Sequence, residues 1–155
     1  MKKQFAEIIS EIDKKYDRLI KSSPFKCSDI PRCYENKAGI YVFYECTTPL
    51  YVGRTNSIRK RLQNHSRRSH MQATFAFLLA RHKTGIRKST YKPSGSRDDL
   101  LRNNPSFAAA FDMARERIRN MDVRVVEEDR PIYQALLEIY TSFVLSTKYN
   151  DFDTH

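Results

Sequence analysis

The stretch from residue 39 to residue 65, GIYVFYECTTPLYVGRTNSIRKRLQNH, constrains the fold more than any other part of the chain. It opens with Gly39–Tyr44, a run rich in β-branched and aromatic residues. Leu50–Val52 repeats that character after the sequence Cys-Thr-Thr-Pro. Two such runs separated by a short break predict a β-hairpin. Gly53 is expected to end the second strand.

A helix is expected directly after the hairpin. Asn56 or Ser57 can cap its N-terminus, because either side chain can accept a hydrogen bond from one of the first free N–H groups. Ile58 and Leu62 then fall on one helical stripe. The stretch is therefore expected to form two strands and a helix in succession.

Four side chains of this unit can come together. Tyr41 and Tyr51 belong to the two strands, whereas Arg61 and His65 belong to the helix. Residues four apart on a helix are neighbours, so Arg61 and His65 lie together at the edge of the apolar stripe. The sequence thus predicts two strand tyrosines that face an arginine and a histidine on a helix.

Positive charge is concentrated in one part of the chain. The 155 residues carry a net charge of +10, and the pI is about 9.6. Residues 54 to 102 hold thirteen Lys or Arg and two acids, a net of +11, whereas the rest has a net of −1. This distribution favours a polyanionic partner over a merely solvated surface. The residues expected to contact nucleic acid are Arg54, Arg59, Lys60, Arg67, Arg68, Arg87, Lys88, Tyr91 and Lys92.

The other segments predict further helices and one more strand. Residues 2 to 22 form an amphipathic helical pattern that would pack on the core and can also carry a homodimer contact. A helix from about residue 71 would end at Gly85, and residues 86 to 97 read as a loop. Asn104 and Pro105 begin a helix that reaches residue 120, and a third strand follows around Val123, Val125 and Val126.

The last helix is expected over Pro131–Leu145 and is apolar nearly all round, with Glu138 as its only charged side chain. Burial of an unpaired carboxylate is costly, so Glu138 needs a cationic partner, a metal ion or an opening to solvent. Its neighbours on the same face, Ala135 and Ser142, are small and would leave room for a cleft. A salt bridge to an arginine is the purely structural alternative.

In two of its segments, the sequence resembles the GIY-YIG nuclease family. Gly39-Ile40-Tyr41 matches the first motif of the family, and Tyr51-Val52-Gly53 matches the second with valine in place of the middle isoleucine. The remaining family positions follow in the same order, at Arg61, His65, Glu138 and Asn150. The resemblance covers residues 39 to 65 and 121 to 150.

The resemblance implies a divalent-metal-dependent DNA endonuclease that hydrolyses phosphodiester bonds. It implies that Glu138 binds a single Mg²⁺ or Mn²⁺ ion, and no second carboxylate is spaced beside it for a two-metal site. Arg61 would hold the scissile phosphate through its guanidinium group. Tyr41 would orient or deprotonate the attacking water, which for a phenol requires cationic neighbours at neutral pH.

The other site residues would have supporting roles. His65 and Tyr51 would hydrogen-bond the phosphate or support Tyr41. Asn150 is carried over as a polar residue that closes the site near the C-terminus. A lone histidine at a helix edge is also common in cores and on surfaces, and His65 has no cysteine partner at zinc spacing, so no zinc site is expected.

The expected fold is α/β, a single GIY-YIG-like nuclease domain over residues 1–155. A three-stranded mixed or antiparallel sheet would be flanked by helices, with residues 1–38 as an N-terminal helical extension and residues 66–120 as a basic helical insertion. The corresponding link is shorter in the minimal form of the family, which leaves the subfamily open. No apolar run reaches the ~18 residues of a membrane span, and the N-terminus has no secretory pattern, so we expect a cytoplasmic protein without a membrane partner.

Three functions are compatible with these features. Metal-dependent cleavage of DNA leads, followed by a catalytically silent nucleic-acid-binding protein on the same fold and by a basic module that binds an acidic protein. The full set of catalytic residue types argues against silence, because binding alone does not require Glu138. The DNA target, and the choice among restriction, repair, mobile-element and phage roles, stay open.

Overall fold

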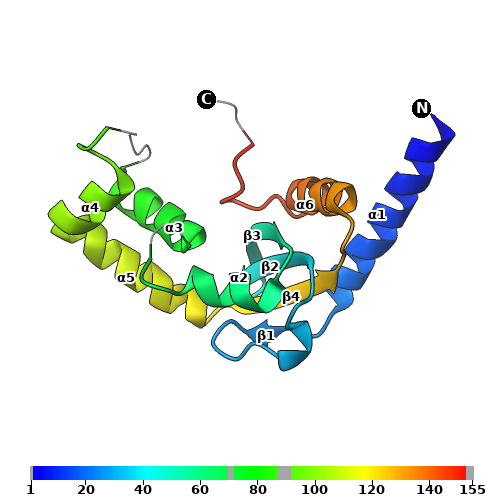
Figure 1. The fold of residues 1–155 in the computed structure, drawn as a ribbon, viewed down its shortest axis with the longest axis horizontal. Coiled ribbons are helices and arrows are strands. Elements are labelled where there is room, and N and C mark those ends of the chain that lie inside the picture. The colour runs from blue at the N-terminus through cyan, green and yellow to red at the C-terminus, as the bar shows by residue number, and fades with distance from the viewer. Residues whose placement is uncertain (1, 70–71, 87–91, 153–155) are drawn as a thin grey trace.

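The computed structural model describes residues 2–69, 72–86 and 92–152. Within these residues, six α-helices and four strands form a mixed α/β fold (Figure 1). The elements are α1 (Lys3–Lys21), β1 (Phe25–Lys26), the 3₁₀ helix η1 (Arg32–Tyr34), β2 (Gly39–Glu45), β3 (Thr48–Thr55), α2 (Ile58–His65), α3 (Thr74–Thr84), α4 (Arg97–Asn103), α5 (Pro105–Arg119), β4 (Asp122–Glu127) and α6 (Pro131–Leu145).

The four strands pair antiparallel in the order β1-β4-β2-β3. On the central strand β2, Tyr41 lies opposite Gly53 of β3 and opposite Val125 of β4. The α/β class is confirmed, but the expected number of three strands is wrong, because β1 adds a fourth at the edge of β4. A strand of two residues is too short to produce an alternation that could be recognised in the sequence.

Helices cover both faces of the sheet, with α1 and α6 on one side and α2, α3 and α5 on the other (Figure 1). Successive side chains of a strand point to opposite faces. Ile40 and Val42 therefore pack toward α1 and α6, whereas Tyr41 and Phe43 pack toward the other three helices. As a result, a tyrosine of β2 lies in the core beside α2.

Strand β3 is longer than the sequence predicts. It begins at Thr48 and continues to Thr55, so the prediction that Gly53 ends the strand is wrong. Gly53 is required for a different reason, since a Cβ atom at this position would overlap the hydroxyl group of Tyr41 on the neighbouring strand. This glycine therefore makes room for a candidate site residue.

Most helix predictions are confirmed. α6 has the predicted bounds, and α5 begins after Asn104, whose side chain accepts a hydrogen bond from the Phe107 N–H group at 3.0 Å. α3 ends at Gly85, which has a φ of 76° that favours glycine. Ser57 occupies the N-cap position of α2 without a capping hydrogen bond from its side chain.

The segment from residue 86 to residue 97 differs partly from the prediction. α4 begins at Arg97, the last residue of this segment, and this helix was not predicted from the sequence. Residues 87–91 of the predicted loop lie outside the described residues. Among the helices described, none has both the length and the apolar character that a membrane crossing requires.

Candidate active site

A buried hydroxyl group lies at the centre of the candidate site. Tyr41 is 1% exposed, and its Oη lies 2.7 Å from Nε2 of His65 and 3.4 Å from Nε of Arg61. Both partners come from α2, where residues 61 and 65 are one turn apart. The predicted meeting of a strand tyrosine with Arg61 and His65 is present in the structure.

His65 is fully buried and is neutral at neutral pH. Burial lowers its pKa well below the usual value, and the positive charge of Arg61 lowers it further. Nε2 bonds to Tyr41, whereas Nδ1 has no hydrogen-bond partner among the described residues. Aromatic rings surround the imidazole at centroid distances of 5.2 to 6.4 Å, from Tyr41, Phe43, Tyr51 and Phe75. His65 can therefore act on a substrate only through Tyr41.

Tyr41 is a neutral phenol in the free protein. Burial raises the pKa of its hydroxyl strongly, and the nearby Tyr51 and Glu138 raise it further. The charge and hydrogen bond of Arg61 oppose this shift without cancelling it. Tyr41 can thus orient a water molecule, but it can take up a proton only if it passes its own to His65.

Tyr51 lies beside this cluster on β3. Its ring stacks on that of Phe75 from α3, with centroids 4.6 Å apart and planes 13° apart. Burial raises the pKa of the Tyr51 hydroxyl, whereas the nearby Arg61 side chain lowers it. Arg61 thus affects both tyrosines, and its NH1 group also donates to the Gln72 carbonyl at 3.1 Å. Gln72 and Phe75 were not identified from the sequence, because one acts through its backbone and the other reads as an ordinary core residue.

Glu138 reaches the same region from α6. Its Oε2 lies 2.9 Å from Nε of Arg54, so the salt bridge that was the structural alternative exists in the free protein. Burial raises the pKa of Glu138, and the charge and hydrogen bond of Arg54 lower it by less. The negative charge of Glu138 also contributes to the raised pKa values of Tyr41 and Tyr51. The carboxylate therefore belongs to the electrostatic environment of both tyrosines.

The residues present at Glu138 fit one hard divalent cation. Carboxylate oxygens are preferred ligands of Mg²⁺, which keeps several water molecules when a protein supplies one or two carboxylates. The side chain of Glu138 retains 21% exposure, which leaves it accessible from one side. In the described part of the chain, no three His, Cys, Asp or Glu side chains converge into a site built of protein ligands alone. Water and phosphate oxygens would have to complete the coordination.

Asn150 contacts a strand rather than a reacting group. Its Oδ1 accepts a hydrogen bond from the Val52 N–H group at 2.8 Å, and its Nδ2 donates to the Val52 carbonyl at 2.8 Å. The N–H group of Tyr149 donates to the Leu50 carbonyl at 3.1 Å. The segment after α6 is thereby fastened to β3 on either side of Tyr51. Asn150 is a positioning residue, since it acts on the site through the backbone of β3.

The residues expected to contact nucleic acid fall into three groups. Arg59 is partly buried, and its buried Nε has no hydrogen-bond partner among the described residues. Arg87, Lys88 and Tyr91 lie outside the described residues. The remaining five are exposed, at Arg54, Lys60, Arg67, Arg68 and Lys92.

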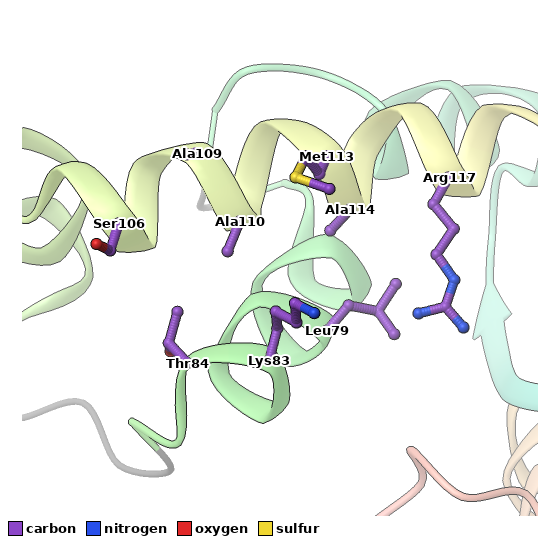
Figure 2. Close-up of a pocket in the computed structure, with 9 residues that line it drawn as sticks. All are labelled: Leu79, Lys83, Thr84, Ser106, Ala109, Ala110, Met113, Ala114 and Arg117. Atoms are coloured by element: carbon purple, nitrogen blue, oxygen red, sulfur yellow. The ribbon is translucent and has the colours of Figure 1, made fainter.

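A separate apolar cavity of about 650 Å³ lies between α3 and α5 (Figure 2). Ala110, Ala114 and Leu79 line it, with the cationic side chains of Lys83 and Arg117 also at its walls. None of its lining residues is a predicted site residue. The cavity is therefore distinct from the tyrosine cluster.

Comparisons of the chain with known protein families, with curated proteins and with solved structures gave no match. The fold and the site define an α/β protein in which a neutral histidine and an arginine both contact the hydroxyl group of a buried tyrosine. An acid contributes to the electrostatic environment of this hydroxyl.

Proposed function

We propose that this protein is a divalent-metal-dependent DNA endonuclease of the GIY-YIG type. The observation that carries the proposal is the convergence of His65 and Arg61 on the Tyr41 hydroxyl, within the electrostatic influence of Glu138. Packing alone would require neither the half-buried arginine nor the half-buried acid, because both groups are costly to remove from water. Phosphodiester hydrolysis uses both.

Arg61 would bind the scissile phosphate. In the free protein its guanidinium donates to two neutral oxygens, the Gln72 carbonyl and the Tyr41 hydroxyl. A phosphate oxygen forms stronger, charge-assisted hydrogen bonds and would replace them. The movement of Arg61 toward phosphate would also open the Tyr41 hydroxyl to water, since the tyrosine is covered in the free protein.

The attacking water would lose its proton to Tyr41 as Tyr41 passes its own proton to Nε2 of His65. The Oη–Nε2 distance of 2.7 Å suits this transfer, and the neutral imidazole can accept the proton if Nδ1 carries the hydrogen. Tyr41 begins and ends as a phenol, so its raised pKa does not block the step. Glu138 would hold the divalent cation, which when bound neutralises charge on the phosphate and assists the leaving oxygen.

Substitution of Glu138 by glutamine tests the proposal. Glu138→Gln preserves side-chain volume but removes the anionic oxygen, so cleavage of supercoiled plasmid in Mg²⁺ should fall by about 10²-fold or more. Binding to DNA should be retained. The matched control is Glu45→Gln, which removes an acid from the exposed ion pair with Arg117 and should cut normally.

A Glu138→Gln variant that nicks and linearises plasmid at the wild-type rate would refute the metal assignment. Loss of the folded circular-dichroism spectrum would instead favour the structural salt bridge with Arg54. The rival function, a catalytically silent DNA-binding protein, is favoured by that ion pair, because Arg54 already neutralises the acid. This rival function predicts that the wild-type protein binds DNA in a salt-sensitive manner without cleaving it.

A further inference from the structure

Arg54 and Glu138 form a contact that the proposed reaction does not use. The two residues are 84 positions apart, so the fold brings them together rather than any local sequence pattern. The bond between Nε and Oε2 is 2.9 Å long. The Arg54 side chain is 48% exposed and that of Glu138 is 21% exposed, which places the arginine on the solvent side of the acid.

This ion pair has the properties of a displaceable contact. Ion pairs with a largely solvated partner contribute little to stability, since water and salt screen the charges. Arg54 is also the first residue of the basic stretch, and a guanidinium group binds phosphate oxygens in a bidentate manner. A DNA backbone phosphate can therefore compete with Glu138 for Arg54.

We propose that Arg54 blocks Glu138 in the free protein and releases it when DNA binds. The arginine would transfer to a backbone phosphate, and the freed carboxylate would then take a divalent cation. This inference rests on the proposed function, because it assigns the cation to Glu138. Its consequence is positive coupling, in which DNA increases the affinity for the cation and the cation increases the affinity for DNA by the same factor.

Cation binding without DNA gives the first test. Mn²⁺ binding to the protein can be followed by the loss of the free-ion signal in electron paramagnetic resonance. Arg54→Gln removes the competitor, so it should bind Mn²⁺ about two- to fivefold more tightly than wild type. The control Arg102→Gln removes the same charge from an exposed ion pair with Asp98 on α4 and should behave like wild type.

The second test adds a short duplex with phosphorothioate linkages throughout, which resists hydrolysis. DNA should tighten Mn²⁺ binding to the wild-type protein. The same DNA should also increase the Mn²⁺ affinity of Arg54→Gln. The factor of increase should be about two- to fivefold smaller than in wild type, because no arginine has to be displaced in the variant. Neither measurement depends on cleavage.

Two outcomes would overturn the inference alone. Equal Mn²⁺ affinities of wild type and Arg54→Gln without DNA would show that Arg54 does not compete with the cation. If Arg102→Gln gained as much Mn²⁺ affinity as Arg54→Gln, the effect would come from the lower net charge and not from the position of Arg54. A third outcome reaches further. If wild type with DNA binds Mn²⁺ no more tightly than Glu138→Gln with DNA, Glu138 is not the ligand and the proposed metal site fails as well.

Discussion

At Tyr41, three constraints meet in one hydroxyl group. The missing side chain of Gly53 leaves room for it, Nε2 of His65 bonds to it, and Arg61 covers it. A buried polar group without a partner costs about 1–3 kcal/mol, so Tyr41 and His65 also depend on each other for stability. The pair is therefore structural and chemical at once.

The tyrosines provide the sharpest test of the proton path. Tyr41→Phe removes the group that takes the proton from water, and single-turnover cleavage should fall about 10²- to 10⁴-fold. Tyr51→Phe removes a supporting polar contact with the nearby Arg61, worth on the order of 1 kcal/mol, and should lower the rate by about fivefold. Both rates are measured with saturating Mg²⁺.

The stability of the two variants should differ as well. Tyr41→Phe leaves the buried His65 without its partner and should lower the free energy of unfolding by about 1–3 kcal/mol, measured in urea. A cleavage defect clearly larger in Tyr51→Phe would move the attacking water to β3. Equal and mild defects in both variants would refute this proton path, since the buried His65 reaches a substrate only through Tyr41.

At the scale of elements, α2 presents both chemistry and charge. Arg61 and His65 point into the site, while Lys60 and the residues after the helix, Arg67 and Arg68, are exposed. Each phosphate contact contributes roughly 0.9 to the slope of log affinity against log salt for duplex DNA. An element that binds the backbone must therefore contribute to that slope.

Replacement of Lys60, Arg67 and Arg68 by glutamine should flatten the salt dependence by roughly two to three contacts. Binding to unrelated duplexes should weaken about equally, because phosphate contacts carry no sequence information. Fluorescence anisotropy across a salt series measures both effects. The control replaces Lys2, Lys3 and Lys14, which are exposed on or next to α1 on the other side of the sheet. An unchanged slope in the first variant would place the DNA elsewhere.

The sequence was informative where a pattern extended over several turns or strands. α5 and α6 carry long periodic signals with proline at their starts, and their bounds were predictable. β1 and α4 span two and seven residues, which is too short for a period to emerge. Gly53 was predicted to end the second strand, because glycine is typical of turns. In the structure its missing side chain leaves space for Tyr41, a role that no local pattern in the sequence indicates.

The contacts of the candidate site were likewise predictable from the sequence only in part. The spacing of Arg61 and His65 on one helix follows from their sequence positions, and the hairpin brings the tyrosines to that helix. The contacts of Glu138 with Arg54 and of Asn150 with Val52 join residues 84 and 98 positions apart. Such pairs depend on how the layers pack, and no local pattern encodes them.

At the scale of the whole molecule, Glu128 connects three parts of the fold. This residue lies between β4 and α6 and is 3% exposed. Its carboxylate bonds to the side chain and N–H group of Arg130, and Lys15 of α1 lies 3.4 Å away. These hydrogen bonds, chiefly those from Arg130, lower the pKa of Glu128 to about 2.

The lowered pKa predicts a dependence of stability on pH. The unfolded chain takes up a proton near pH ~4.3 and the folded protein only near its lower pKa, so acid favours unfolding. Glu128 should stabilise the fold by up to roughly 3 kcal/mol above pH ~5, and this contribution should disappear as the pH falls toward 2. The comparison is urea unfolding of wild type and Glu128→Gln at pH 6 and pH 3.

The difference in unfolding free energy between these proteins should be larger at pH 6 and about half as large at pH 3. Glu127→Gln, which alters an ion pair with Lys37 that is about half exposed, is the control and should cost little at either pH. A difference for Glu128→Gln that does not change with pH would mean that the glutamine side chain disturbs packing rather than charge.

The fastening of the C-terminal segment has a consequence for association between molecules. β3 is an outer strand of the sheet, and an outer strand with free N–H and C=O groups can pair with a strand of another chain and start aggregation. The side-chain amide of Asn150 offers Val52 one donor and one acceptor, as a peptide group of a neighbouring strand would. One asparagine thus occupies both free backbone groups of Val52, and the residues that hold Tyr51 in place also withdraw this part of the edge from pairing with a second molecule.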